Sequence, residues 1–470
     1  MRRTTYSVRS LVKPDVIKIE WDKSPLEVFT ALCERYDYAY LLESVEGPKK
    51  IAEYSFVGFE PISVISVKNG LAEVYNRDKS RGERRVVSDP LLLVKEVVGR
   101  RYKASNGFRF IGGAVGYLSY DVIRYWENLP EYAVDDFNLP DLEVGIYNDG
   151  IVFDHKTGEA FYYYFGENRL KEVEEALKEK LSPESPSYSD PKSNVEKEEF
   201  EEIVRKSKEY IFSGDAFQIV LSRRLEFSIH GSLIPFYNVL RSINPSPYMY
   251  FLKMKRCKIV GSSPEMLVRV EDRTVETYPI AGTRPRIKGN PIEDDILAQE
   301  LLCDPKECAE HVMLVDLARN DLGKVSEFGS ISVPEFMRVY KYSHVQHLVS
   351  RVVGRLRSSC DCYDAVRAVF PAGTVTGAPK VRAMEIIEEL EPVRRGPYAG
   401  AVGYFSYNGN ADFAITIRTL IVSGNRAFIQ AGAGIVADSV PEKEWFETEH
   451  KASALLKALH MTSEGGENRP

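Results

Sequence analysis

Short apolar runs and turn residues alternate through the first third of the chain, between residues 15 and 165. The runs include VIKIEW, YAYLLES, EYSFVGF and FIGGAVGYLSYDVIRY, and turn pairs such as Asn69-Gly70 and Asp149-Gly150 lie between them. Apolar runs bounded by turn residues predict strands joined in hairpins. Helices are expected over residues 25–36 and 90–98. Because a regular βαβ alternation is missing, the pattern predicts an α+β fold with a large, sandwich-like antiparallel β-sheet core and surrounding helices.

A change of composition near the middle of the chain suggests a division into regions. Residues 167–181, ENRLKEVEEALKEKL, predict a charged amphipathic helix, and the Pro- and Ser-rich residues 182–194 follow it. Such a segment is typical of a linker or a surface crossing. A new helix is expected after Asn194 and ends at Gly214. The expected organisation is therefore an N-terminal α+β region (1–181), a linker or crossing (182–194) and a C-terminal region (195–470).

Residues 304–321, DPKECAEHVMLVDLARND, predict a helix that carries its own start signals. Asp304 is a good N-cap, Pro305 suits the first helical position, and Glu307, three residues after Asp304, predicts a capping box. Glu307 and Glu310 are three residues apart, so their carboxylates share one helical face.

A second helix, expected to open at Ser439-Val440-Pro441-Glu442, carries Glu444 and Glu447 with the same spacing. Four carboxylates gathered across a site repel one another unless a cation joins them, and all-oxygen ligands favour Mg²⁺ or Ca²⁺. The same spacing on a charge-rich helix is also typical of a solvated face. Neighbouring motifs have to decide between these interpretations.

Composition excludes several classes of protein. The net charge of the 470 residues is −7, which gives no basic footprint for nucleic acid. No apolar run is long enough to predict a membrane span, and the basic opening residues lack the apolar core of an export signal. The six cysteines show no C-x-x-C spacing. We therefore expect a reduced, cytoplasmic protein that binds neither membrane nor nucleic acid.

Further residues suggest a small anionic ligand. Gly432 to Ala437, GAGIVA, superficially matches a dinucleotide-binding fingerprint, but the following helix starts too late for a dehydrogenase. Glycine N–H groups facing an anion are the better interpretation. Arg418 lies among apolar residues and needs a partner, whereas Lys451, four residues after Glu447, also fits an ordinary helical ion pair. Glu265, in GSSPEML, lies where a carboxyl group can stay neutral and act as an acid.

Several longer motifs then resemble one family in the same order along the chain. These are PIAGTRPR (279–286), DPKECAEHVMLVDLARNDLG (304–323), FPAGTVTGAPKVRAMEII (370–387) and QAGAGIVADSVPEKEWFETEHKA (430–452). They resemble the chorismate-utilising enzymes, and most closely the large subunits of anthranilate synthases (component I). The resemblance covers residues 195–460 strongly and the N-terminal region more weakly. It implies that residues 195–470 form the catalytic region.

The resemblance implies a role for each matching residue. Glu310 and Glu447 are similar to direct Mg²⁺ ligands, with Glu307 and Glu444 adjacent or bound through water. Glu265 matches the general acid that protonates the departing C4 hydroxyl of chorismate, and His347 and Thr374 match residues near the enolpyruvyl group. The substrate-binding set matches Gly282, Thr283, Tyr398, Arg418, Gly432, Ala433, Gly434 and Lys451.

Two positions favour one branch of that family. Relatives that add water place a lysine base where this chain has Gln218, and an amide takes no proton from water, so the nucleophile is expected to be ammonia. Aminodeoxychorismate synthases often carry a nucleophilic lysine where this chain has Ala281, and a methyl group forms no covalent adduct. The expected reaction is ammonia addition to chorismate, through aminodeoxyisochorismate, to anthranilate and pyruvate. Ammonia would come from a separate glutamine amidotransferase subunit, so a hetero-oligomer in tryptophan biosynthesis is expected.

A regulatory site is also implied. Residues Glu43 and Ser44 of LLES, with Pro247, Tyr248 and Met249 of NPSPYMYF, resemble a tryptophan feedback site. One departure is Glu53, since the family often has arginine before YSF. The alternatives to the main interpretation are an aminodeoxychorismate synthase component I and a non-catalytic homologue that senses tryptophan.

Overall fold

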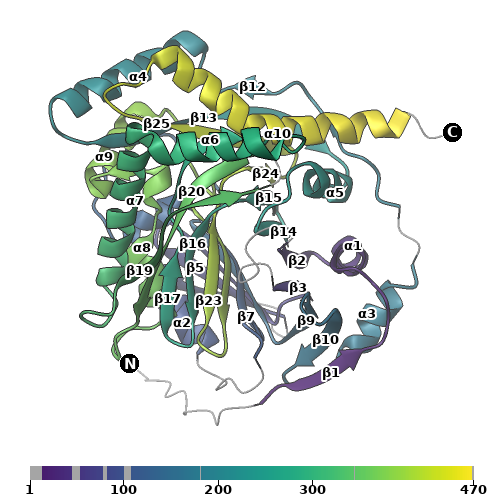
Figure 1. Cartoon of the computed structure of the whole chain (residues 1–470). Coiled ribbons are helices and arrows are strands. Elements are labelled where there is room, and N and C mark those ends of the chain that lie inside the picture. Colours follow the sequence, from purple (N-terminus) through teal and green to yellow (C-terminus); the bar gives the residue numbers. More distant parts are fainter. Residues whose placement is uncertain are drawn as a thin grey trace.

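The computed structural model describes residues 13–44, 53–77, 82–99, 107–179, 182–342 and 345–467. Two large antiparallel sheets form the centre of the molecule, and helices pack around them (Figure 1). This arrangement confirms the predicted α+β class with a sandwich-like core.

The first sheet has the strand order β1-β10-β9-β3-β2-β14-β15-β24-β25-β13-β11, with β12 and β21 also paired to β13. Its strands are β1 (Asp15–Ile19), β2 (Tyr38–Glu43), β3 (Tyr54–Phe59), β9 (Asp149–Asp154), β10 (Glu159–Tyr164), β11 (Ser187–Tyr188), β12 (Lys192–Ser193), β13 (Gln218–His230), β14 (Tyr248–Met254), β15 (Cys257–Ser263), β21 (Gly377–Ala378), β24 (Thr419–Ser423) and β25 (Arg426–Ile435).

The second sheet has the order β18-β20-β17-β16-β23-β22-β7-β8-β4-β5-β6, and β19 pairs with β20. Its strands are β4 (Ser63–Lys68), β5 (Leu71–Asn76), β6 (Glu83–Val86), β7 (Gly113–Leu118), β8 (Leu142–Tyr147), β16 (Met266–Glu271), β17 (Thr274–Thr277), β18 (Ile280–Pro285), β19 (Ser332–Lys341), β20 (Val345–Arg355), β22 (Ala401–Ser406) and β23 (Ala411–Ile415).

The helices lie outside the two sheets, and α10 runs across the top of the molecule in Figure 1. They are α1 (Pro25–Arg35), α2 (Pro90–Val98), α3 (Leu170–Ala176), α4 (Lys197–Phe212), α5 (Ile234–Ile243), α6 (Pro291–Cys303), α7 (Pro305–Gly323), α8 (Cys362–Val369), α9 (Lys380–Leu390) and α10 (Pro441–Glu467), with 3₁₀ turns η1 (Tyr120–Tyr125) and η2 (Gly373–Val375). No helix in these described ranges is long and apolar enough to cross a membrane.

The main hydrophobic core lies between the sheets. Tyr40 of β2 and Tyr147 of β8 meet edge to face with ring centroids 4.7 Å apart, and Phe56 of β3 lies 5.8 Å from Tyr404 of β22. Each such aromatic pair contributes about 0.5–1.5 kcal/mol beyond the burial of its area. Because strands from both sheets supply these rings, the core holds the sheets in a fixed relation. The site described below depends on that relation.

Both sheets combine strands from the N-terminal and C-terminal regions. In the first sheet β2 pairs with β14, and in the second β7 pairs with β22. The segment 182–194 runs along the edge of the first sheet, since β11 and β12 pair with β13. It is therefore a surface crossing with its own strand pairs. Backbone hydrogen bonds therefore join the N-terminal and C-terminal regions into the same two sheets.

Two predictions of secondary structure were wrong. YDVIRY, expected as strand, forms η1, where Asp121 is buried and accepts a hydrogen bond from Arg124 (3.2 Å). Among the described residues of the helix expected over 167–181, those of Leu170–Ala176 are α-helical, and residues 180 and 181 lie outside the described ranges. The helix starts late because Arg169 is buried in an ion pair with Asp149 (2.5 Å), which holds the preceding residues out of the helix.

Candidate active site

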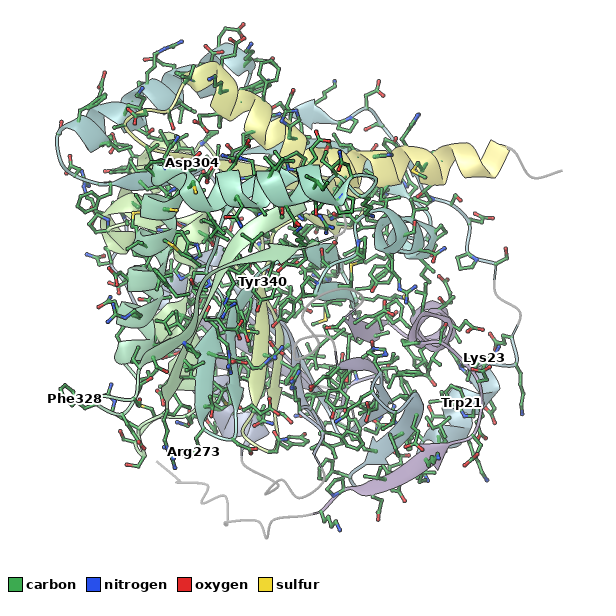
Figure 2. All side chains as sticks on the ribbon, viewed as in Figure 1. Trp21, Lys23, Arg273, Asp304, Phe328 and Tyr340 are labelled. Atoms are coloured by element: carbon green, nitrogen blue, oxygen red, sulfur yellow. The ribbon has the colours of Figure 1, made fainter. Side chains whose placement is uncertain are left out.

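The start of α7 places two of the predicted glutamates. The side chain of Asp304 (labelled in Figure 2) accepts hydrogen bonds from the N–H groups of Lys306 (3.0 Å) and Glu307 (3.3 Å), which confirms the predicted N-cap. The reciprocal half of the capping box was wrong. The Glu307 carboxylate lies 3.4 Å from Arg284 of β18 instead. A nearby cation attracts this carboxylate more strongly than one backbone N–H does.

Strand β25 carries the predicted glycines inside a strand, which excludes the loop that a dinucleotide fingerprint needs. A Cβ on Gly432 would lie 2.8 Å from the hydroxyl of Tyr398, and one on Gly434 would lie 2.7 Å from Nε2 of Gln218. Ala433, between them, faces the opposite side and is buried in the core under α4 and α9. The two glycines therefore make room for the side chains of Tyr398 and Gln218.

The glutamates of α7 and α10 influence one another's charge. Burial raises the pKa of Glu310, and the carboxylates of Glu307 and Glu447 raise it further. Burial also raises the pKa of Glu444, with a further contribution from Glu447. These carboxylates therefore lie within electrostatic reach, as the E-x-x-E spacing predicted. In the part of the chain that the structure describes, no group of three or more His, Cys, Asp or Glu residues is close enough to hold a metal ion. The Mg²⁺ assignment stays a prediction.

Glu310 and Glu447 each contact a further residue of the predicted site. Gln218 donates a hydrogen bond from Nε2 to Oε1 of Glu310 (2.7 Å). Lys451 forms the expected helical ion pair with Glu447 (2.7 Å), and it also donates to the carbonyl oxygen of Gly432 (2.8 Å). The position that distinguishes branches of the family is thus in direct contact with a predicted metal ligand.

Glu265 has the properties of a neutral acid. Its side chain is buried, and Thr374 of η2 donates a hydrogen bond to it (2.8 Å). Burial raises the pKa of Glu265 to about 7, although the Thr374 hydrogen bond and the charges of Lys451 and Arg418 oppose the rise. The strand after it, β16, pairs irregularly with β23 between Met266 and Val268, and such bulges redirect nearby side chains. The sequence prediction of a protonatable carboxyl group agrees with this environment.

His347 of β20 is held in one tautomer. Its Nδ1 lies 2.8 Å from the carbonyl oxygen of Gly282 and 3.1 Å from the hydroxyl of Thr283. A carbonyl only accepts, so we assign the proton to Nδ1, which leaves Nε2 as an acceptor. Burial lowers the pKa of His347 to about 4, so the ring is neutral near pH 7. Gly282 has φ +68° at an irregularity of β18, which favours glycine there.

Arg418 lies in the turn between β23 and β24. Burial lowers its pKa and the charge of Glu265 opposes this shift, yet an arginine remains protonated. Arg418 has φ +49° and Ala399, beside Tyr398, has φ +60°. Positive φ at residues other than glycine is uncommon and tends to occur at functional sites. The ranges described above contain no carboxylate in ion-pair contact with Arg418, so its charge is available to an anion.

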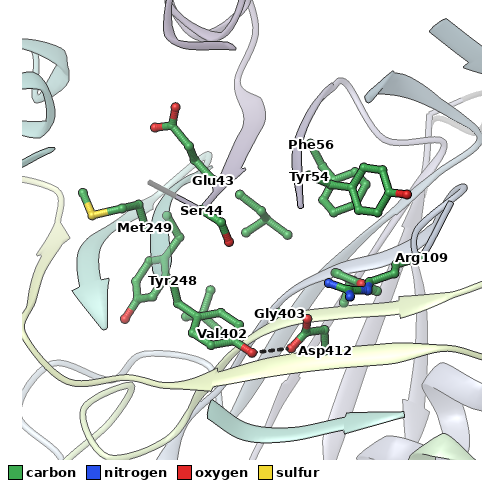
Figure 3. Close-up of a pocket in the computed structure, with 13 residues that line it drawn as sticks. Glu43, Ser44, Tyr54, Phe56, Arg109, Tyr248, Met249, Val402, Gly403 and Asp412 are labelled. Carbon is green, nitrogen blue, oxygen red and sulfur yellow. Dashed lines mark hydrogen bonds between the residues drawn. The ribbon is translucent and has the colours of Figure 1, made fainter. Parts of the chain in front are cut away.

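Four of the five predicted regulatory residues, Glu43, Ser44, Tyr248 and Met249, line a separate pocket between the two sheets (Figure 3). Its walls are aromatic and apolar, with a few charged groups among them: Leu42, Glu43, Ser44, Tyr54, Phe56, Arg109, Tyr248, Met249, Tyr250, Val402, Gly403, Tyr404 and Asp412. Ser44 donates to the carbonyl oxygen of Pro247 (2.6 Å), and Tyr248 donates to Asp412 (2.9 Å). The Glu43 carboxylate is bound by Tyr237 (3.0 Å) and Arg241 (2.9 Å). The five predicted residues are therefore neighbours.

Arg109 in this pocket was not anticipated. Its guanidinium pairs with Glu53 (2.7 Å) and Glu271 (3.0 Å). Glu53 is the departure noted in the sequence, and the structure shows that it contacts an arginine from a distant segment. A charged residue at an unusual position indicates that the fold provides an oppositely charged partner. The sequence alone does not identify which residue that partner is.

Two buried ion pairs close to the predicted catalytic residues were also missed. Arg395 pairs with Glu391 (2.6 Å) and donates to the carbonyl oxygens of Val375 and Val220 (2.7 Å each), which ties η2 to β13. Lys380 of α9 pairs with Asp321 of α7 (2.6 Å). These four charged residues lie within the motifs quoted above or shortly after them. That position was the sequence signal that could have identified them.

The fold and the site together define the class of protein. The model of the chorismate binding enzyme family matches residues 37–457, and the chain belongs to this family. It is similar to anthranilate synthase component 1 of Methanothermobacter thermautotrophicus, with 48% identity over 98% of this chain and 97% of that protein. The crystal structure of anthranilate synthase component I from Streptococcus pneumoniae matches with TM-score 0.74 and 37% identity, over 87% of this chain and 93% of that one. Aminodeoxychorismate synthase component 1 of Bacillus subtilis is 41% identical over 96% of this chain and 98% of that protein. These findings confirm the resemblance seen in the motifs.

Proposed function

We propose that this chain converts chorismate and ammonia to anthranilate and pyruvate, with Mg²⁺ as cofactor. The observation that carries the proposal is the hydrogen bond from Gln218 to Glu310 (2.7 Å). An amide at this position supplies no base there to activate water. Ammonia needs no such base, because its lone pair is already nucleophilic.

The residues around this position supply the remaining steps. Arg418 and Lys451 offer two cations for the substrate carboxylates. Glu265, protonated below a pKa of about 7, gives its proton to the C4 hydroxyl as the C4–O bond breaks and ammonia adds at C2. His347, neutral and with an unprotonated Nε2, would lie beside the enolpyruvyl group that leaves as pyruvate. Each role uses a protonation state that the surroundings favour.

Glu310 and Glu447, with Glu307 and Glu444 close by, would hold Mg²⁺, which would polarise and anchor a substrate carboxylate. The fit rests on the chemistry of this donor set. The four groups are all carboxylates, and the pKa of Glu310 is raised partly by its neighbours Glu307 and Glu447. A divalent cation relieves such repulsion, and oxygen donors suit magnesium.

The proposal includes a partner and a compartment. Relatives named component 1 imply a second component, and ammonia at neutral pH is mostly ammonium, so a glutamine amidotransferase subunit would supply it. The complex would be a cytoplasmic hetero-oligomer. The purified chain alone should then form anthranilate from chorismate when a high concentration of ammonium salt is given at alkaline pH with Mg²⁺.

The decisive experiment measures anthranilate fluorescence and pyruvate release in that reaction. Equal amounts of both products, lost on chelation and restored by Mg²⁺, support the proposal. Chorismate consumption without pyruvate would favour aminodeoxychorismate synthesis, which the relative from Bacillus subtilis makes the second candidate. A folded protein that binds tryptophan but never consumes chorismate, with or without an amidotransferase, would instead be a sensor.

Replacing Gln218 by lysine should change the nucleophile. The lysine would place a base beside Glu310, so we expect anthranilate formation to fall at least about tenfold and a water-addition product to rise, or turnover to cease. Product analysis by chromatography measures the ratio. Gln218→Met is the matched control, because it removes the amide without adding a base and should give no water addition. An unchanged product ratio in Gln218→Lys would contradict the role assigned to this position.

The aromatic pocket would bind tryptophan as a feedback inhibitor, with Arg109 as the cation for its carboxylate. Replacing Arg109 by methionine should raise the tryptophan concentration for half-inhibition at least about tenfold, since charged hydrogen bonds contribute roughly 1.5–3 kcal/mol. Uninhibited turnover should be unchanged. The control is Arg84→Met, which removes an exposed ion pair with Glu73 (2.8 Å) away from the pocket. If tryptophan inhibits the unmodified chain, Arg109→Met and Arg84→Met equally, Arg109 does not bind tryptophan.

A further inference from the structure

A second small cavity reaches Glu265 from the side of α7. Its volume is about 40 Å³, and its walls include Glu265 and Thr374 at one part and Asp321 at another. One water molecule needs about 10–15 Å³ by this measure, so the cavity has room for more than one. We propose that it is a water-filled path through which Glu265 regains its proton after each turnover. This inference rests on the proposed role of Glu265 as the acid.

The wall on the helix side is one face of α7. Leu317, Ala318 and Asp321 lie three, four and seven residues after Leu314, so the four side chains follow one another along the helix for about 10 Å. The facing wall is η2 with the residue before it. A Cβ on Gly373 would collide with the side chain of Leu317, which shows how closely these walls approach. The lining of the cavity therefore includes both Glu265 and a face of α7 that ends at Asp321, and α7 and η2 approach each other closely at Leu317.

Charged groups mark the other end of the path. Asp321 is buried, yet its carboxylate pairs with Lys380 (2.6 Å) and Lys324 (2.8 Å). The Lys324 side chain is 52% exposed, whereas that of Lys380 is 12% exposed. Lys324 thus contacts both solvent and a carboxylate in the cavity wall. The hydroxyl of Thr277, also in the wall, is a further polar group for water.

Among the protein's own groups, the substrate side of Glu265 offers no comparable source of protons. The charged groups that act on Glu265 there are Lys451 and Arg418, and both are proposed to bind the substrate. Thr374 donates its hydroxyl proton to the Glu265 carboxylate in a hydrogen bond and has none to give up (2.8 Å). An approach from α7 leaves the substrate and its ligands undisturbed.

The proton balance of the reaction requires such recharging. Glu265 loses its proton to the C4 oxygen, and the C4–O bond breaks to release water. The added nitrogen loses one proton as it changes from an ammonium to an amine, so no net proton is consumed. Glu265 recovers a proton along the water path, while that released proton leaves to solvent.

The test separates the first turnover from those that follow. Asp321→Asn removes the charge at the outer end, and Ala318→Leu fills the cavity. Both variants should form the first equivalent of product at the rate of the unmodified chain, at a pH below the value of about 7 at which Glu265 titrates. Steady-state turnover should then fall at least about fivefold, because recharging the acid has become slow. The affinity for chorismate should stay within about twofold of that of the unmodified chain, since no substrate ligand changes.

The matched control is Asp316→Asn, the same change on the exposed face of α7, where Asp316 pairs with Arg319 (2.6 Å). This variant should leave both the rate of the first turnover and the steady-state rate unchanged. A small diffusible buffer acid should restore steady-state turnover in Asp321→Asn. If Asp321→Asn fails to fold, Ala318→Leu decides alone. Equal slowing of both phases, or steady-state turnover like that of the unmodified chain, would overturn the inference. If the unmodified chain itself forms no product, the proposed function fails instead.

Discussion

Replacing Glu265 by glutamine is expected to lower kcat by about 10²–10⁴-fold, the usual contribution of one positioned proton donor. Glutamine keeps the size and hydrogen bonding of the side chain but donates no proton to a leaving hydroxyl. Chorismate affinity should therefore change little, and isothermal titration together with pyruvate release measures the two effects separately. A variant with near-normal turnover would show that another group is the acid.

The same assignment predicts the direction of the pH dependence. Burial raises the pKa of Glu265 to about 7, and the acid works only while protonated, so kcat/KM should decrease as the pH rises through that value. Rates have to be expressed per free ammonia, whose concentration rises with pH. Thr374→Val removes a hydrogen bond that favours the carboxylate and should move the decrease to higher pH. If kcat/KM of Thr374→Val decreases at the same pH as that of the unmodified chain, the Thr374 hydrogen bond does not influence the pKa of the acid.

Replacing Glu310 or Glu447 by glutamine should reduce turnover at least about 100-fold, because loss of a ligand weakens metal binding more than loss of a supporting contact does. The amide keeps the shape and removes the negative charge. Raising the Mg²⁺ concentration should restore part of the activity. Steady-state rates over a Mg²⁺ titration, with metal affinity measured by calorimetry, test this prediction.

Glu300→Gln on the exposed face of α6 is the control for surface charge and should behave like the unmodified chain. Near-normal rates in both Glu310→Gln and Glu447→Gln would contradict the metal assignment. Tight Mg²⁺ binding with no turnover would instead point to a defect in orienting the substrate.

Local signals in the sequence predicted much of this site. The Asp304 cap and the shared face of Glu307 and Glu310 follow from contacts within one helical turn, and such contacts depend on neighbouring residues alone. The protonatable character of Glu265 was anticipated from its place in the loop-to-strand stretch GSSPEML, whereas its burial was learned from the structure. The reciprocal capping bond of Glu307 failed because Arg284, from a different strand, competes for the carboxylate.

The sequence by itself therefore determined the elements, the α+β class and the chemical groups that α7, β25 and α10 present. Only the tertiary structure decided which groups meet. It brings Gln218 to Glu310, Arg109 to Glu53 and Thr374 to Glu265, pairs that are 92, 56 and 109 residues apart. The physical reason is that helix caps and turns are fixed by a few adjacent residues. The pairing of distant strands depends on the packing of both sheets together, and no short stretch encodes it.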